Sequence, residues 1–124
     1  MSARILIADD EPLLTEMLGF RLRARGYQAV IAHDGREALA RFEDARPAAV
    51  VLDAMMPVHD GMEVLRRIRA SEAGGDVPII VLSARRGEKD IVQALQAGAS
   101  DYIVKPFLPE ELMARLQRLL DGRP

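Results

Sequence analysis

The sequence predicts an α/β fold in which a doubly wound, five-stranded parallel sheet is covered by five helices. Five short apolar runs alternate with five segments of helical periodicity, and this alternation is typical of a parallel sheet with helices on both faces. A chain of 124 residues is also a common size for one domain with one hydrophobic core. We therefore expect a single domain over residues 1–124.

Each strand is predicted from a short apolar run, and each helix from apolar residues three and four positions apart. In chain order, with a helix after every strand, the predicted elements are Arg4–Ala8, Pro12–Arg25, Gln28–Ala32, Arg36–Ala45, Ala48–Leu52, Gly61–Ser71, Ile79–Leu82, Glu88–Ala97, Tyr102–Val104 and Pro109–Leu120. Leu14, Leu18 and Leu22 form the apolar face of the first helix. Because all strands run in parallel, a ligand site is expected beyond their carboxyl ends.

Several residues mark where the helices begin and end. Asp34 with Glu37, and Asp60 with Glu63, stand at the spacing of a capping box before the second and third helices. Pro109 suits the first position of the last helix. Glycines follow the first and fourth helices, where they favour termination. These signals agree with the boundaries drawn from apolar spacing.

The composition argues against several functions. The net charge is −2, and the 17 basic residues are spread over several helices, so this domain alone is not expected to bind nucleic acid. Cysteine is absent, which removes disulfides and thiolate metal sites and fits a reducing compartment. The first apolar run, of about five residues, is too short for a signal peptide or a membrane span. We expect a soluble, cytoplasmic domain with no membrane partner.

The histidines and several arginines are expected to be ordinary solvent-exposed residues. His33 and His59 are expected in loops, because two histidines without a third matching ligand make no convincing transition-metal site. Arg66, Arg67 and Arg69 are expected on a solvated helix face rather than in a binding patch.

Polar side chains follow every predicted strand. His33 and Asp34, after the second strand, are expected to be a loop residue and a helix cap, and the other four strand ends are expected to share one edge. Asp9 and Asp10 come after the first strand, Asp53 after the third, Ser83 after the fourth and Lys105 after the fifth. Taken singly, such an aspartate is more often a helix cap or a turn residue. Their joint position at the carboxyl ends of parallel strands favours one shared functional site.

The charges of this site point to a divalent cation and to phosphoryl chemistry. Two carboxylates 4 Å apart repel by about 4 kcal/mol at an effective dielectric constant near 20, and Lys105 offsets only part of the repulsion among three. Magnesium binds one or two carboxylates, keeps waters and completes its shell with a phosphate oxygen, so Mg²⁺ is the expected cofactor. A nucleophilic carboxylate, a hydroxyl, an ammonium and a metal suffice for phosphoryl transfer to an aspartate.

Four stretches of the chain resemble a known family. They are Ile7–Pro12 (IADDEP), Leu52–Pro57 (LDAMMP), Val81–Ala84 (VLSA) and Gly98–Phe107 (GASDYIVKPF). In order and spacing they are similar to the receiver domain of bacterial two-component response regulators, over about residues 4–122. The resemblance implies a flavodoxin-like or CheY-like three-layer sandwich with strand order 2-1-3-4-5.

The resemblance also implies a role for each residue at the strand ends. Asp53 would accept a phosphoryl group from a phosphohistidine of a sensor kinase or phosphotransfer protein. Asp10 and Asp53 would ligate Mg²⁺ directly together with the Met55 backbone carbonyl, whereas Asp9 would act mainly through a metal-bound water. Such a domain catalyses its own phosphorylation and dephosphorylation but is not a turnover enzyme.

Further positions match the residues that hold the phosphoryl group and transmit the signal. Ser83 and Lys105 would hold the phosphoryl oxygens, and the Lys105–Pro106 peptide bond would be cis, which an X-Pro bond tolerates. Tyr102 resembles the family's switch aromatic, which turns inward when Ser83 moves toward the phosphoryl group. An ordinary half-buried strand tyrosine is the alternative for this position.

The fourth helix, fifth strand and fifth helix would form the output face. Asp101, Glu111 and Arg115 match part of the charge pattern of receivers that form phosphorylation-dependent homodimers there. Ile91 and Ala97 depart from this pattern, because they stand where those receivers often carry charged partners.

Three rival functions fit the residues less well. A haloacid-dehalogenase-type phosphatase needs a second aspartate where this chain has Met55. In a flavodoxin-like electron carrier, Asp9, Asp10 and Glu11 would repel the cofactor phosphate, and the chain has no Trp to stack on a flavin. A pseudo-receiver usually lacks part of the acidic cluster or the lysine, and both are present here.

The end of the chain leaves the output open. Pro106 and Phe107, followed by the start of the fifth helix, resemble receivers that precede a winged-helix DNA-binding domain. Receivers coupled to cyclic-nucleotide enzymes, or standing alone, end in the same way. A C-terminal output domain beyond Pro124 is therefore one of the expected alternatives.

Overall fold

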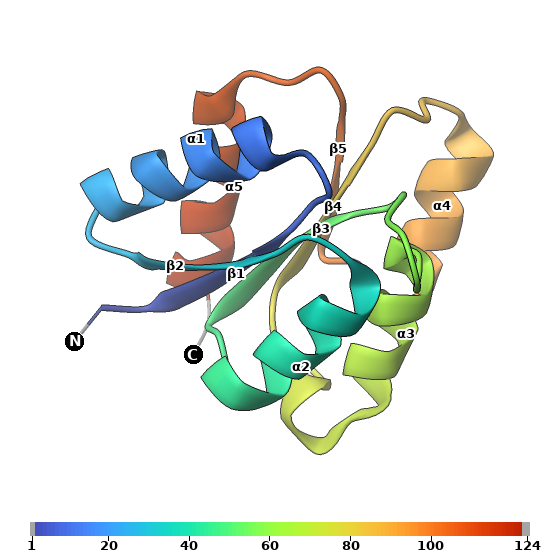
Figure 1. Ribbon diagram of the computed structural model, residues 1–124. Coiled ribbons are helices and arrows are strands. Elements are labelled where there is room, and N and C mark those ends of the chain that lie inside the picture. Colours follow the sequence, from blue (N-terminus) through green and yellow to red (C-terminus); the bar gives the residue numbers. More distant parts are fainter. Residues whose placement is uncertain (1, 123–124) are drawn as a thin grey trace.

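The computed structural model describes residues 2–122 and contains five strands and five α-helices in alternation (Figure 1). In chain order the elements are β1 (Arg4–Ala8), α1 (Pro12–Ala24), β2 (Gln28–Ala32), α2 (Gly35–Ala45), β3 (Ala49–Asp53), α3 (Gly61–Ala70), the 3₁₀ turn η1 (Glu72–Gly74), β4 (Ile79–Ser83), α4 (Glu88–Gln96), β5 (Asp101–Val104) and α5 (Pro109–Asp121). Every predicted helix and strand is therefore confirmed, with ends that differ by no more than one residue.

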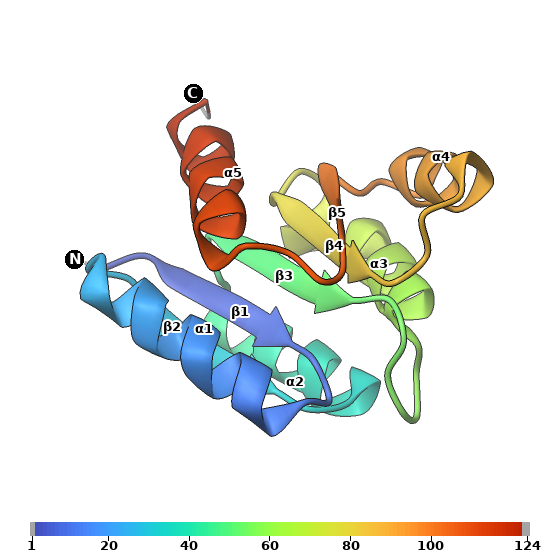
Figure 2. The same cartoon turned by 90° about the horizontal axis from the view of Figure 1, so that it is seen from above.

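The strands form one parallel sheet in the order β2-β1-β3-β4-β5, which confirms the predicted fold class. Helices α1 and α5 cover one face, and α2, α3 and α4 cover the other (Figures 1 and 2). Residues of β3 and β4 are buried throughout, as expected for central strands covered on both faces. The sheet thus forms a rigid base whose carboxyl-end edge carries the predicted site residues.

Two central strands extend one residue further than their apolar runs. Asp53 pairs with Leu82 across β3 and β4, and Ser83 pairs with Val104 across β4 and β5. The sheet ladder therefore fixes the backbone of both polar residues. From their polarity, Asp53 and Ser83 are expected in loops. Their places in the sheet hold them more rigidly than loop positions would.

The predicted caps at the start of α2 and α3 are confirmed. Asp34 accepts a hydrogen bond from the backbone of Glu37 at 2.7 Å, and Asp60 accepts one from Glu63 at 2.9 Å. The carboxylate of Glu37 does not complete the box at Asp34; it accepts from the backbone N–H of His33, at 2.9 Å. The cap nevertheless fixes the helix start.

Two glycines allow the loop between β3 and α3 to pack closely against its surroundings. A Cβ atom at Gly61 would lie 2.1 Å from the carbonyl oxygen of Asp53, and one at Gly35 would lie 2.0 Å from the carbonyl oxygen of His59. No side chain fits at such distances. The start of α3 is therefore held against the strand end that carries Asp53, and the start of α2 against the loop that follows it.

The expected solvent exposure of Arg69 is wrong. Its guanidinium is part-buried and donates to the backbone carbonyls of Gly98 at 2.9 Å, Gly74 at 2.9 Å and Val77 at 2.7 Å. Burial lowers the pKa of this arginine, and the charge of Asp76 opposes the shift. Arg69 thus ties the loop before β4 to the end of α4.

The solvated-loop expectation holds for His33 but not for His59. The exposed His33 shares a hydrogen bond of 3.2 Å with the Thr15 hydroxyl. His59 is only partly exposed, and its Nδ1 atom lies 3.0 Å from a carboxylate oxygen of Glu63.

Within residues 2–122, no helix combines the length and the apolar character needed to cross a membrane.

Candidate functional site

Three aspartates meet at the carboxyl-end edge of the sheet. Asp9 follows β1 and is fully buried, Asp10 is exposed beside it, and Asp53 ends β3 with only 4% of its surface exposed. One carboxylate oxygen from each residue lies within 4.8 Å of the others. The structure thus brings together the three carboxylates that the sequence predicts as a cluster.

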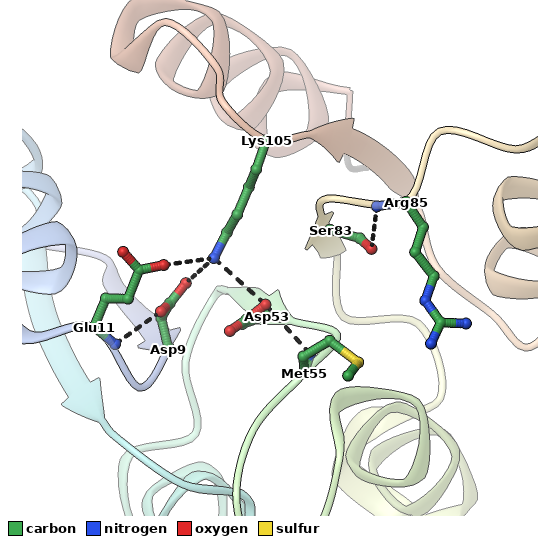
Figure 3. Close-up of polar contacts among 7 residues, drawn as sticks. All are labelled: Asp9, Glu11, Asp53, Met55, Ser83, Arg85 and Lys105. Carbon is green, nitrogen blue, oxygen red and sulfur yellow. Dashed lines mark hydrogen bonds and ion pairs between the residues drawn. The ribbon is translucent and has the colours of Figure 1, made fainter.

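Lys105 reaches this cluster from the end of β5 (Figure 3). Its Nζ atom lies 2.8 Å from Asp9 Oδ2, 3.3 Å from Glu11 Oε1 and 3.5 Å from Asp53 Oδ1. Burial pulls the pKa of Lys105 down, but the hydrogen bond to Asp9 and the charges of Asp53 and Asp9 outweigh it, so the pKa lies above its ordinary value. The lysine is therefore a permanent cation at neutral pH.

The surroundings of Asp53 disfavour the ionised form of its carboxyl group. Burial and the charge of Asp9 raise the pKa of Asp53 from 3.8 to about 6, although Lys105 and the backbone N–H of Met55 lower it. One ammonium does not compensate three carboxylates. A divalent cation bound by oxygen ligands fits this donor set.

The two oxygens of Asp9 already have protein partners. Oδ1 accepts the backbone N–H of Glu11 at 3.0 Å, and Oδ2 accepts Lys105. Asp53 differs, because both of its contacts, with Met55 N–H at 3.3 Å and Lys105 at 3.5 Å, involve Oδ1. Among residues 2–122, none donates a hydrogen bond to Asp53 Oδ2. This oxygen is available to react or to bind an ion.

Ser83 and Tyr102 lie next to the cluster and are joined through one residue. Ser83 is buried at the end of β4, and its Oγ accepts the backbone N–H of Arg85 at 3.1 Å. Tyr102 donates its hydroxyl to the backbone carbonyl of Arg85 at 2.9 Å. A cavity of about 130 Å³ is lined by these side chains together with Met55, Asp90 and neighbouring residues. The Lys105–Pro106 peptide bond is cis.

The three charged residues expected on the output face are in contact within one chain. Arg115 on α5 lies 3.0 Å from Asp101 on β5 and 3.0 Å from Glu111, one turn earlier on α5. Ile91 on α4 is partly buried. Any use of Arg115 between two copies of the chain therefore has to compete with these internal ion pairs.

Sequence reasoning missed two features of the site. Glu11 was not expected to contact Lys105, although its place directly after Asp9 and Asp10 puts it at the same strand end. The sequence also does not indicate that Arg85, two residues after Ser83, joins Ser83 to Tyr102 through its backbone. Both links depend on how the loops fold back, for which the sequence has no periodic signal.

The strand order and the carboxylate–lysine edge together define a flavodoxin-like α/β domain with a charged site at the carboxyl ends of its strands. The family model described as "Response regulator receiver domain" matches residues 5–117. The chain therefore belongs to the response regulator receiver domain family, which is the predicted family.

Curated relatives agree with this family and are longer than the chain. The response regulator MprA of Mycobacterium tuberculosis (strain H37Rv) is 49% identical over 120 residues, which are 97% of this chain and 51% of MprA. The transcriptional regulatory protein TrcR of the same organism is 46% identical over 117 residues, covering 94% of this chain and 45% of TrcR. The chain thus spans about half the length of the curated relatives it matches.

Solved structures show the same fold. The chemotaxis response regulator CheY4 of Vibrio cholerae matches with a TM-score of 0.90 and 34% identity, over 96% of this chain and 99% of that chain. The receiver domain of the sensor histidine kinase PA1611 from Pseudomonas aeruginosa matches with a TM-score of 0.88 and 38% identity, over 98% of this chain and 100% of its own. That structure has a magnesium ion coordinated in the active-site cleft.

Proposed function

We propose that this chain is one receiver domain, with a core over about residues 4–122, whose Asp53 accepts a phosphoryl group from a phosphohistidine of a sensor kinase or phosphotransfer protein. The observation that carries the proposal is the position of Asp53. It ends a central strand, contacts Lys105 and Met55 N–H through one oxygen, and leaves the other oxygen without a protein donor among residues 2–122. This is the arrangement of an oriented nucleophile.

The transfer forms one bond and breaks one bond. A carboxylate oxygen of Asp53 attacks phosphorus, the P–N bond of the phosphohistidine breaks, and its electron pair returns to the imidazole, which takes up a proton. Lys105, already 3.5 Å from Asp53, pairs with a phosphoryl oxygen. The Ser83 hydroxyl donates to another, and these contacts stabilise charge that develops on the transferring group.

The carboxylate cluster supports a Mg²⁺ site. Asp10, Asp53 and the Met55 carbonyl would hold the ion directly, whereas Asp9 would act through a water because both of its oxygens already accept protein donors. When bound, Mg²⁺ supplies the positive charge that lets the carboxylates and a phosphoryl group share one site. The magnesium ion in the PA1611 receiver structure is consistent with this assignment.

The signal would leave through α4, β5 and α5. Ser83 moves toward the phosphoryl group, Tyr102 follows inward, and the face carrying Asp101, Glu111 and Arg115 changes its contacts with a second copy or with an output domain. The curated relatives MprA and TrcR are about twice as long as this chain, and their length favours an output domain as such a partner. We expect no direct nucleic-acid or membrane partner for this domain, a cytoplasmic location, and self-catalysed phosphorylation and dephosphorylation without turnover of other substrates.

Phosphorylation by a small donor tests the proposal. The chain is incubated with acetyl phosphate and Mg²⁺, or with excess chelator, and its intact mass is measured. One added phosphoryl group is expected with Mg²⁺, and none with chelator or in Asp53→Asn. Asp44→Asn, an equal charge change at an exposed position of α2, is the control and should be phosphorylated normally. Undiminished labelling of Asp53→Asn would contradict the assignment.

A further inference from the structure

Arg85 occupies a junction between the site and α4. Its backbone N–H donates to the Ser83 hydroxyl, and its carbonyl accepts the Tyr102 hydroxyl, so its backbone is fixed to both proposed switch residues. Its guanidinium, in contrast, extends away from the carboxylates and Lys105 (Figure 3). It pairs with Asp90 in the first turn of α4, at 3.5 Å. The side chain of Arg85 is thus the movable part of an otherwise fixed residue.

The pair between Arg85 and Asp90 is easy to break. The two side chains are 61% and 35% exposed, and ion pairs in such surroundings contribute little. Helix α4 has few other attachments: of residues 88–96, all within the described part of the chain, only Ala94 is buried. Loss of this pair is therefore expected to have a small but measurable effect on the opening of the first turn of α4.

We propose that Arg85 senses the phosphoryl group and exchanges partners. In the unphosphorylated protein it pairs with Asp90; when Asp53 carries a phosphoryl group, the guanidinium turns to its oxygens and releases Asp90 and the first turn of α4. The inference rests on the proposed phosphorylation of Asp53. It adds a residue that links the phosphoryl group to helix α4.

Charge and space both support the exchange. A phosphoryl group carries more negative charge than a carboxylate and accepts an arginine through two parallel hydrogen bonds. The site around Asp53 is also better shielded from solvent than the exposed pair with Asp90. The cavity of about 130 Å³ is lined by Ser83, Arg85 and Asp90, and also by Ala54 and Met55, the two residues that follow Asp53. The space that Arg85 borders therefore adjoins both its present partner and the loop directly after the proposed phosphorylation site.

The affinity for beryllofluoride, a phosphoryl mimic, tests the first half of the exchange. With Mg²⁺ present, Arg85→Gln should bind the mimic about tenfold more weakly than the unmodified chain, because a charge-assisted contact is lost. Arg86→Gln removes the same charge from the next residue, for which the structure shows no ion pair within residues 2–122, and should bind normally. Equal affinities of both variants would overturn the proposal.

Hydrogen exchange of the α4 amides tests the second half. The mimic should raise exchange in residues 88–96 by about two- to fivefold in the unmodified chain. Asp90→Asn should show this raised exchange without the mimic, whereas Glu88→Gln, an equal charge change in the same helical turn, should not. Identical exchange in Asp90→Asn and Glu88→Gln would overturn the partner exchange. Mimic binding that survives in Asp53→Asn would instead overturn the proposed phosphorylation site.

Discussion

Removing the charge of Asp53 should stabilise the metal-free protein at neutral pH. Burial and the neighbouring Asp9 raise the pKa of Asp53 from 3.8 to about 6, so the ionised group opposes folding. An increase of the pKa from 3.8 to about 6 corresponds to about 3 kcal/mol in the free energy of unfolding. Solvent at the open side of the site screens part of this energy, and we expect Asp53→Asn to raise the free energy of unfolding by about 1 to 2 kcal/mol.

The pH dependence of this gain has a defined sign. Between pH 3.8 and about 6 the folded protein binds more protons at Asp53 than the unfolded chain does, so this group's contribution to stability falls as pH rises through that window. Asp53→Asn removes the fall. The difference between variant and unmodified chain should therefore be small near the lower end of the window and reach its full size above the upper end.

Urea unfolding in chelator across this pH range measures the difference directly. Asp44→Asn, on the exposed face of α2, is the control for the change in net charge and should show no such pH-dependent gain. Added Mg²⁺ should stabilise the unmodified chain more than Asp53→Asn, because the ion binds the folded cluster. A destabilised Asp53→Asn, or a gain that grows toward low pH, would refute the charge argument.

Three further substitutions test the dephosphorylation step, the backbone strain and the output face. Met55→Asn should speed loss of the phosphoryl group by about two- to tenfold, because an amide can orient the attacking water by a hydrogen bond and the exposed thioether cannot. The loss is measured as the decrease of intact mass over time. Equal or slower loss in the variant would count against this role of residue 55. Val58 has a φ of 71° in a tight turn where the N–H of residue 59 donates to the carbonyl of residue 57. Val58→Gly should relieve this backbone strain and raise the free energy of unfolding by about 0.5 to 1 kcal/mol, with exposed Val92→Gly as a control that should destabilise α4. Arg115→Glu should weaken phosphorylation-dependent self-association in sedimentation with Mg²⁺ and beryllofluoride, and a dimer indifferent to this change would move the output surface elsewhere.

The site residues at the strand ends could be predicted because a parallel sheet brings all carboxyl ends to one edge. Asp53 and Ser83 are part of the strand ladder, and Asp9 and Lys105 directly follow its last paired residues, so their proximity does not depend on the paths of the loops. The strand boundary at Leu52 was one residue short, because a polar residue after an apolar run resembles a loop start. In the folded chain, Asp53 still pairs across the sheet.

Contacts that depend on loop paths could not be predicted. Glu11 and Lys105 are 94 positions apart, and only the packing of the first and last loops brings them within 3.3 Å. Arg69 has the sequence context of an exposed helical arginine, yet its partners are carbonyls of Gly74, Val77 and Gly98 in two separate loops. Every residue type has a backbone carbonyl, so the sequence does not show which carbonyls an arginine will contact. The burial of Arg69 could therefore not be predicted from the spacing of apolar residues.

The most direct test of the central claim is to locate the phosphoryl group in the chain. The protein is phosphorylated with acetyl phosphate and Mg²⁺ and treated with borohydride, which reduces an acyl phosphate to an alcohol, and the peptides are sequenced by mass spectrometry. Reduction is expected at residue 53 alone, so that Asp53 is read as homoserine. A reduced residue at Asp9 or Asp10, or a phosphoryl group that resists reduction because it sits on Ser83 or a histidine, would contradict it.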